Sequence, residues 1–300
     1  MKPLILIDFD GTMANTFVDS PNGFNVTNAY LYAIWELFGE NGVRAFHERG
    51  GLRNSPPEEL AEDIQRRTLQ VDAPAREVAK QIVDIKLSLI APEISTSWPR
   101  LYPGFKDFMD VVGRAEGTFK LGVLSSGHDG FISRVFEVNG FRPPDILVTN
   151  DYLSQRRFPM RQRYKPRSYQ MAVAHKQWLN GRDAIDSSKP EPYLGRSYEK
   201  PRIVYIGDDP NKDGGLGIEA RVPFIFVPFT TPNFVPDPEK GQLGVKDFTE
   251  VAKILRESEA DLADGKSFAR MLFGKEDVEL FPPVPDGEVY RKILRERSFV

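Results

Sequence analysis

The sequence contains no cysteine and only three histidines among its 300 residues. The absence of cysteine excludes a disulfide scaffold, a zinc or iron–sulfur site with thiolate ligands, and a cysteine nucleophile. It also fits a protein that works in a reducing compartment. The three histidines, His47, His128 and His175, are widely spaced and form no metal-binding pattern.

Long hydrophobic runs are also missing. A membrane-spanning helix needs roughly 20 apolar residues, whereas the first apolar run, Leu4–Ile7, ends at Asp8. This run is too short for a signal peptide as well, so we expect a soluble, cytoplasmic protein with no membrane partner. Hydrophobic residues still make up 40% of the chain, which is enough for a sizeable core and too many for a disordered chain.

Neither sign of charge dominates the chain. The 40 basic and 43 acidic side chains give a formal net charge of −3, which argues against broad nucleic-acid binding. One local exception is a basic stretch without an acid, made of Arg156, Arg157, Arg161, Arg163, Lys165 and Arg167. Beside an active site such a loop could attract a polyanionic substrate or a nucleic-acid end, or it could simply offset the charge of an acidic site.

Five short apolar segments are predicted to be buried strands. They are Pro3–Phe9, Lys120–Ser125, Ile146–Thr149, Arg202–Ile206 and Pro223–Phe229. Their hydrophobic residues are continuous rather than alternating, which is typical of parallel strands that are covered on both faces. Segments with helical periodicity lie between them, so we predict an α/β protein with a Rossmann-like, doubly wound parallel sheet.

Residues 16–100 interrupt this alternation because they contain no good strand. The predicted helices there are Asn25–Phe38, Pro56–Leu69 and Ala75–Ala91. We therefore expect an all-helical domain over residues 16–100, inserted into a core made of residues 1–15 and 101–250, with a helical extension over 251–300. The aromatic residues Phe24, Tyr30 and Trp35 are predicted to belong to the core of the helical insert.

Two aspartates end the first predicted strand, in the segment Ile7-Asp8-Phe9-Asp10-Gly11-Thr12. Asp8 and Asp10 are two residues apart, so their side chains would share a face of a strand. Gly11 also lets the chain turn directly after them. Asp8 and Asp10 can therefore approach one point. In sheets of this kind ligands bind beyond the carboxyl ends of the strands, and these aspartates lie at such an end.

Carboxylates also cluster after the predicted strand Arg202–Ile206, at Asp208, Asp209 and Asp213. Acids that share one small loop repel one another unless a cation offsets their charge. Ligand sets that consist only of oxygen atoms suit Mg²⁺, which takes a few carboxylates, water and substrate phosphate. The segment therefore predicts a magnesium site.

Two further segments offer groups that can bind an anion. Ser125, Ser126 and Gly127 end the second predicted strand, where hydroxyl and backbone N–H groups can cradle a phosphate at the start of a helix. Lys165 precedes a predicted helix, Ser168–Leu179, and would add a positive charge.

Taken in chain order, these four segments resemble the motifs of the haloacid dehalogenase-like superfamily. The residues that match are Asp8, Asp10 and Thr12 in the first motif, Ser125 in the second, Lys165 in the third, and Asp208 and Asp213 in the fourth. Lys189 is a rival for the third motif, and Lys165 is preferred because an amphipathic helix follows it. The resemblance covers about residues 1–15 and 101–250, and the helical insert resembles the cap of that superfamily.

The resemblance implies a Mg²⁺-dependent phosphatase that acts on a small phosphorylated metabolite. Asp8 would be the nucleophile and would form an aspartyl-phosphate, and Asp10 would protonate the leaving oxygen and then activate water. The implied ligands of Mg²⁺ are Asp8, the backbone carbonyl of Asp10, and Asp208. Asp213 would orient water bound to the ion, and Asp209 could serve either role. Ser125 and Lys165 would hold the phosphate oxygens, and Thr12, Ser126 and Gly127 would add contacts to the substrate.

Several alternatives remain open. Asp10 favours a phosphatase over the dehalogenases and ATP-driven pumps of the superfamily, but a sugar phosphomutase shares this acid. A protein that has kept the fold and only binds a partner is a third possibility. In the helical insert, Arg49 and Arg53 are the candidates for gripping an anionic group of the substrate. The oligomeric state is left open by these residues.

Overall fold

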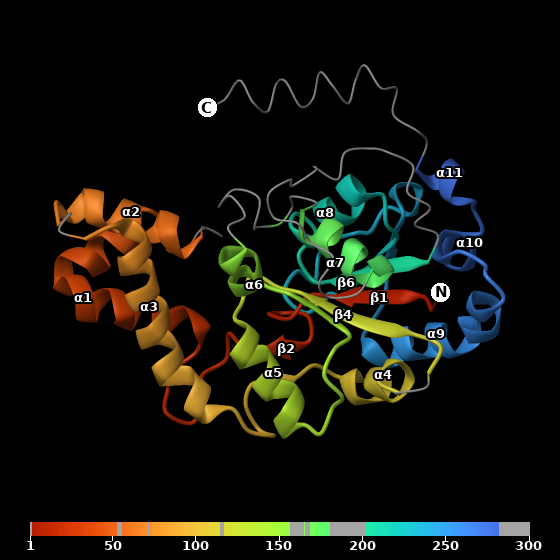
Figure 1. Ribbon diagram of the computed structural model, residues 1–300, viewed down its shortest axis with the longest axis horizontal. Coiled ribbons are helices and arrows are strands. Elements are labelled where there is room, and N and C mark those ends of the chain that lie inside the picture. The colour runs from red at the N-terminus through yellow and green to blue at the C-terminus, as the bar shows by residue number, and fades with distance from the viewer. Residues whose placement is uncertain are drawn as a thin grey trace, which may run out of the picture. The chain divides into compact units, whose positions relative to one another are not determined.

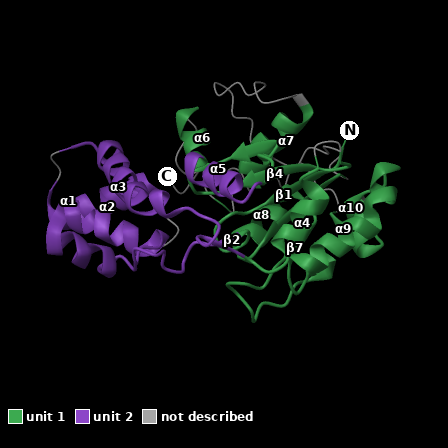
Figure 2. Cartoon of the chain, turned by 90° about the horizontal axis from the view of Figure 1, so that it is seen from below, with its two compact units in different colours: residues 1–13, 102–129, 141–300 green, residues 14–101, 130–140 purple. Residues whose placement is uncertain are grey.

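The computed structural model describes residues 2–52, 56–70, 73–114, 117–156, 165, 169–180 and 202–281. The chain divides into two compact units, which Figure 2 shows in different colours. The first unit contains Met1–Met13, Tyr102–Asp129 and Phe141–Val300, and the second contains Ala14–Leu101 and Gly130–Gly140. The assignment of these parts as catalytic core, cap and carboxyl-terminal extension stays a prediction.

A parallel sheet forms the centre of the first unit. Within the described residues it has six strands in the order β5-β4-β1-β6-β7-β8, and every neighbouring pair is parallel. The strands are β1 (Leu4–Ile7), β4 (Lys120–Leu124), β5 (Ile146–Val148), β6 (Ile203–Gly207), β7 (Phe224–Phe226) and β8 (Gln242–Gly244). The predicted Rossmann-like α/β core is confirmed. Strand β8 was not predicted, because Leu243 is its one hydrophobic residue.

Helices cover both faces of this sheet. In Figure 1, α7 (Tyr169–Asn180) and α8 (Asp213–Ala220) lie on one side of it, and α4 (Phe105–Val112) and α9 (Phe248–Ala263) lie on the other. On the first side, Leu6 and Tyr205 share a buried cluster with the residues of α7 and α8. On the second side, the ring of Phe248 contacts that of Phe105 at 5.0 Å between centroids. All four residues of β1 are consequently buried, as expected for a central parallel strand.

The remaining elements of the first unit are short. They are α6 (Asn150–Gln155), α10 (Phe268–Phe273), α11 (Asp277–Leu280) and a 3₁₀ helix, η3 (Pro238–Lys240). The limit predicted for the core, residue 250, falls inside α9, so this helix is continuous across it. In the part of the chain that the structure describes, no helix has both the length and the hydrophobicity needed to cross a bilayer.

The second unit is mainly helical. Its elements are α1 (Val26–Glu48), α2 (Pro57–Thr68), α3 (Ala75–Ile90), a 3₁₀ helix, η1 (Ala91–Glu93), most of α5 (Asp129–Val138), and a short antiparallel pair, β2 (Ala14–Asn15) and β3 (Arg100–Leu101). It has its own core, in which Ile34, Ile64 and Ile82 are fully buried. The first helix was predicted to end at Phe38, and α1 in fact bends at Gly39, whose φ is +61°, before it continues.

The expectation that Trp35 is a core residue is wrong. Its side chain is 49% exposed, whereas the preceding residue, Ile34, is fully buried. Neighbouring residues on an α-helix point about 100° apart, and Trp35 follows the buried pair Ala33 and Ile34 on the side that turns away from the core. Phe24 and Trp35 each contact the ring of Tyr32, with centroid distances of 5.5 and 5.6 Å.

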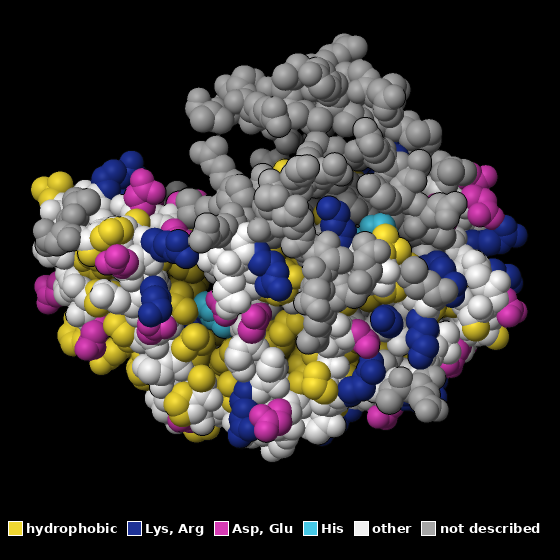
Figure 3. Space-filling model, viewed as in Figure 1, with side chains coloured by type: hydrophobic (Ala, Val, Ile, Leu, Met, Phe, Trp, Pro, Cys, Tyr) yellow, Lys and Arg dark blue, Asp and Glu magenta, His cyan; other side chains and the backbone are white. Residues whose placement is uncertain are grey.

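Figure 3 shows that basic and acidic side chains are intermingled on the described surface in this view.

A buried ion pair joins the end of α1 to α2. The Arg49 side chain is 3% exposed, and its Nε donates to Oδ2 of Asp63 at 3.0 Å. Burial by itself raises the pKa of Asp63, but the hydrogen bonds and charges of Arg49 and Arg66 outweigh this effect and hold the pKa below its ordinary value of 3.8. The pair therefore stabilises the folded state most when Asp63 is ionised.

We predict that Asp63→Asn lowers the free energy of unfolding at pH 7 by about 3 kcal/mol, because it removes the carboxylate that pairs with the buried Arg49 guanidinium. A carboxyl whose folded-state pKa is depressed stabilises the fold above its unfolded pKa. That contribution is lost as the pH falls through the folded value, so the difference between variant and wild type should shrink below about pH 4. Urea unfolding at pH 7 and pH 3 measures both effects.

Asp84→Asn is the control, since Asp84 is 62% exposed and pairs with Lys80 at 3.8 Å on the surface of α3. It should change stability by less than about 0.5 kcal/mol. Equal stability of Asp63→Asn and wild type at pH 7 would contradict the structural role of the pair.

Candidate active site

Three neighbouring strands of the sheet end in polar side chains. Asp8 follows β1, Ser125 follows β4, and Asp208 follows β6. Because β4, β1 and β6 are adjacent and parallel, their carboxyl ends bring these residues to one edge of the sheet. This convergence is expected from the positions of the three residues at strand ends.

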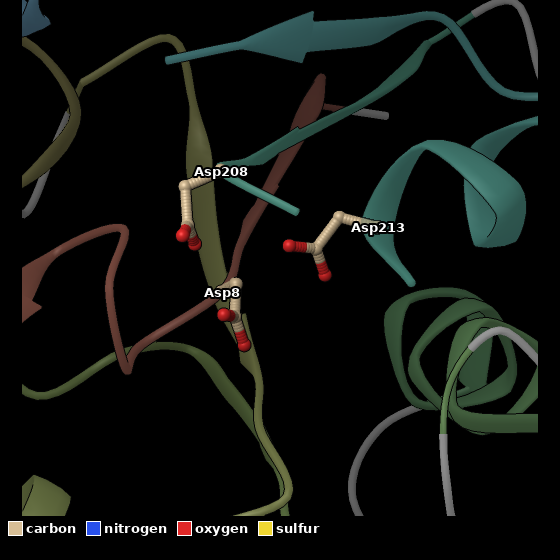
Figure 4. Close-up of side chains that lie close together, drawn as sticks. All are labelled: Asp8, Asp208 and Asp213. Carbon is tan, nitrogen blue, oxygen red and sulfur yellow. The ribbon is translucent and has the colours of Figure 1, made fainter. Parts of the chain in front are cut away.

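Asp213 joins this edge from the first turn of α8. Asp8, Asp208 and Asp213 each offer a carboxylate oxygen, and these atoms all lie within 4.8 Å of one another. Figure 4 shows the three side chains close together. Asp208 and Asp213 are buried, at 4% and 1% exposure, so solvent screens their mutual repulsion only weakly.

Lys165 lies against this group of carboxylates. Its Nζ donates to Oδ1 of Asp8 and, at 2.8 Å, to Oδ1 of Asp213. The Lys165 side chain is 4% exposed. Burial by itself lowers the pKa of Lys165, but the carboxylates of Asp213 and Asp8 outweigh burial and hold the pKa above its ordinary value, so the ammonium stays charged. The rival, Lys189, lies outside the described residues.

One ammonium group does not compensate three buried carboxylates. Burial raises the pKa of Asp8 well above its usual range; Lys165 opposes this shift, and the charges of Asp213 and Asp208 add to it. Burial, together with the charge of Asp213, likewise raises the pKa of Asp208 to about 6. A divalent cation with a preference for oxygen ligands would supply the missing positive charge, so this set of donors fits a metal ion such as Mg²⁺.

Hydroxyl groups orient the Asp208 carboxylate from both sides. Thr12 Oγ1 donates to Oδ1 of Asp208 at 2.5 Å, and Thr230 Oγ1 donates to Oδ2. Thr12 is buried, as expected for a residue of the first motif. Thr230 comes from the loop after β7, which no motif marked.

Two glycines provide the space for the carboxylates of Asp208 and Asp213, because they have no side chain. Gly11 has a φ of +83°, and a Cβ built on it would lie 2.7 Å from Oδ2 of Asp208. A Cβ on Gly207 would lie 2.5 Å from Cβ, Cγ and Oδ2 of Asp213. These distances are shorter than van der Waals contact, so a side chain at either position would displace a carboxylate.

Asp10 and Asp209 lie outside the group of three carboxylates. Asp10 is half-buried and follows Asp8 by two residues, just before the turn at Gly11. Asp209 shapes its own loop, because its Oδ1 accepts from the backbone N–H groups of Asn211 and Lys212, both at 2.9 Å. The backbone N–H of Asp209 also donates to Oδ2 of Asp213 at 3.2 Å.

The loop after β4 has a defined local structure. Ser125 is buried, and its Oγ accepts from the backbone N–H of Gly127 at 2.9 Å. Ser126 is exposed and Gly127 is half-buried. His128, which the sequence analysis did not select, is buried with Nδ1 at 3.1 Å from Oδ1 of Asp151 in α6. This contact ties the loop after β4 to α6.

The two arginines proposed to grip substrate have different outcomes. Arg49 is buried in the second unit, where it binds Asp63 and the backbone carbonyls of Gly51 and Leu52. These contacts stabilise the unit and give no support to a role in substrate binding. Arg53 lies outside the described residues.

Two tyrosines near the carboxylates were not selected from the sequence. Tyr205 is fully buried in β6, and its hydroxyl donates to Oδ1 of Asp213 at 2.6 Å. Tyr102 stacks on Phe229 with ring centroids 4.0 Å apart. Burial and the charge of Asp208 raise the pKa of Tyr102 to about 12, which places this side chain in the electrostatic field of the site.

The comparisons with known proteins agree with this fold. No protein-family model matches the sequence, and no curated protein matches it. Among solved structures, a mutant of CbbY from Rhodobacter sphaeroides in complex with xylulose-1,5-bisphosphate is 18% identical and covers 83% of this chain and 96% of its own, with a TM-score of 0.51. A HAD-superfamily hydrolase from Geobacter sulfurreducens is 15% identical over 85% of this chain and 96% of its own, with a TM-score of 0.47. The chain has the haloacid dehalogenase-like fold.

We predict that Gly207→Ala lowers the free energy of unfolding by about 2 kcal/mol, because the new Cβ overlaps the Asp213 carboxylate. The displacement of Asp213 should also remove any increase in melting temperature that MgCl₂ gives to the wild type. Thermal unfolding with and without MgCl₂ measures both.

Gly130→Ala is the matched control, since nothing lies within 4 Å of a Cβ at this position in α5. Alanine is the better helix former by up to about 1 kcal/mol, so this variant should be as stable as wild type or more stable. If the two variants behaved alike, the steric argument for Gly207 would be wrong.

Proposed function

We propose that the protein is a Mg²⁺-dependent phosphatase that hydrolyses a phosphate ester of a small metabolite. The observation that carries this proposal is the arrangement of Asp8, Lys165, Asp208 and Asp213 at one edge of the sheet. The similarity to CbbY, which was crystallised with a sugar bisphosphate, supports a phosphorylated substrate.

Asp8 is the proposed nucleophile. One of its carboxylate oxygens would attack phosphorus and form an aspartyl-phosphate, while the bond from phosphorus to the ester oxygen breaks. Asp10 would give a proton to the departing oxygen. Asp10 would then take a proton from water as the water attacks the phosphorus atom, which releases inorganic phosphate and restores the Asp8 carboxylate.

Lys165 and Ser125 would hold the phosphate oxygens during both steps. The Lys165 ammonium has three N–H groups, and the two carboxylates that it contacts account for two of them. The third can donate to a phosphate oxygen. Because Gly127 N–H donates to Ser125 Oγ, the Ser125 hydroxyl can present its own hydrogen to the phosphate.

The carboxylates of Asp8, Asp208 and Asp213, with the backbone carbonyl of Asp10, are the groups that would hold Mg²⁺. When bound, the ion would supply positive charge that offsets the repulsion between the carboxylates and a phosphate dianion. The hydroxyls of Thr12 and Thr230 would keep Asp208 in the orientation that this role requires.

The second unit is the proposed cap, which would select the substrate and exclude water during the reaction. The exposed side chains of Tyr32 and Trp35 give this unit an aromatic surface of its own. Arg53 remains a candidate for binding a second anionic group, as proposed from the sequence.

We predict that Asp8→Asn reduces the release of phosphate from p-nitrophenyl phosphate or sugar phosphates about a thousandfold or more, because the amide cannot act as the nucleophile. Chelation of Mg²⁺ with EDTA should abolish the activity of the wild type, and added MgCl₂ should restore it. Asp107→Asn, which changes an exposed aspartate of α4, is the control and should keep full activity.

Full activity of Asp8→Asn would refute the proposed mechanism. Conversion between sugar-phosphate isomers with little free phosphate, observed by ³¹P NMR, would identify a phosphomutase in place of a phosphatase. No Asp8-dependent turnover on a broad panel of phosphoesters would favour a binding function.

We predict a different result for Asp10→Asn with p-nitrophenyl phosphate. Nitrophenolate leaves without a proton, so the first step should be slowed less than the second, which needs a base for water. The variant should release about one equivalent of nitrophenol per protein and then stall. Rapid-mixing measurements of nitrophenol, with mass spectrometry of the phosphorylated chain, test this. Equal slowing of both steps would exclude the assigned role.

A further inference from the structure

Tyr205 places a polar group inside an otherwise hydrophobic layer of the first unit. It lies in β6, where it is in register with Leu6 of β1 and Phe224 of β7. It is fully buried in the cluster formed with α7 and α8. A phenylalanine would fill the same volume, so the requirement for packing does not explain the hydroxyl. A buried hydroxyl is retained at no cost only when it is hydrogen-bonded.

The partner of this hydroxyl is Asp213. Residues 205 and 207 lie on the same face of β6, because side chains alternate along a strand. Gly207 has no side chain, and the Asp213 carboxylate occupies the space over it. From there Oδ1 of Asp213 accepts the hydrogen bond of the Tyr205 hydroxyl at 2.6 Å.

The same carboxylate oxygen also accepts from Lys165. The distance from Lys165 Nζ to Oδ1 of Asp213 is 2.8 Å, and the ammonium lies 5.4 Å from the centroid of the Tyr205 ring. Tyr205 therefore contacts both members of this ion pair, one through its hydroxyl and the other through its ring. The second oxygen of Asp213 is held by the backbone N–H of Asp209.

We propose that Tyr205 is a positioning residue that fixes the rotamer of Asp213 and, through the shared oxygen, the place of the Lys165 ammonium beside Asp8. A lysine side chain has four rotatable bonds, so the site must restrict it from outside. Asp213 can restrict the lysine side chain only if its own carboxylate cannot rotate. The Tyr205 hydroxyl and the backbone N–H of Asp209 both hold this carboxylate in place by hydrogen bonds. This role rests on the proposed function of the same site.

The test compares Tyr205→Phe with Tyr152→Phe. The second variant removes a hydroxyl that is buried against the same cluster but has no hydrogen-bond partner within the described part of the chain. With saturating MgCl₂ and p-nitrophenyl phosphate, Tyr205→Phe should lower kcat about tenfold and change KM less than twofold, because Lys165 acts most strongly on the charge of the transition state. Tyr152→Phe should match the wild type.

Three measurements separate positioning from a general effect on the fold. The melting temperature should confirm that Tyr205→Phe folds. Isothermal titration calorimetry with MgCl₂ alone should show weaker binding to Tyr205→Phe, by about fivefold, and no change for Tyr152→Phe. In an Asp213→Asn background, Tyr205→Phe should have little further effect on kcat, since the hydroxyl acts through that carboxylate.

Values of kcat and of the Mg²⁺ dissociation constant within twofold of wild type for Tyr205→Phe would overturn the inference. Equal losses in the two tyrosine variants, or additive losses with Asp213→Asn, would do so as well. Absence of wild-type turnover would instead refute the proposed function. In that case, crystal structures of wild type and Tyr205→Phe would still test the inference. It requires that the side chains of Asp213 and Lys165 move in the variant.

Discussion

The repulsion between three buried carboxylates is the constraint on which the candidate site depends. Asp8, Asp208 and Asp213 each have a carboxylate oxygen within 4.8 Å of the other two. Solvent screens the repulsion between these charges only weakly, because the side chains are buried. The surrounding groups all act on this repulsion: Lys165 brings a positive charge, and Thr12, Thr230 and Tyr205 donate hydrogen bonds to the carboxylates. The negative charge that these groups leave uncompensated is what suits the site to a divalent cation.

The sheet order explains how distant parts of the sequence supply this site. β1 lies between β4 and β6, so the ends of these three strands meet although the chain between them is long. The helical unit is inserted after the turn that follows β1 and returns before α4. The insertion leaves the register of β1 with its neighbours intact.

The sequence was sufficient for the parallel core and for the residues that end its strands. Continuous apolar runs predicted β1, β4, β5, β6 and β7, and the polar groups after them led to Asp8, Ser125 and Asp208. It was not sufficient for Tyr205, because a tyrosine within an apolar strand looks the same whether or not its hydroxyl has a partner. Thr230 was missed because its loop has no pattern. For Arg49 a role in substrate binding stays a prediction, and the sequence did not reveal that Arg49 pairs with Asp63.

The pairing of β1 also has a consequence for how the chain folds during synthesis. Leu4 is made before its strand partners, Lys120 and Ile203, which emerge from the ribosome much later. The core shared by α1, α2 and α3 lies entirely before β4 in the chain, so it can form before either neighbour of β1 has been made. Contacts between residues so far apart in the chain slow folding and leave a hydrophobic strand exposed in the nascent chain. A chaperone that shields β1 until both neighbours are made would therefore raise the yield of native protein.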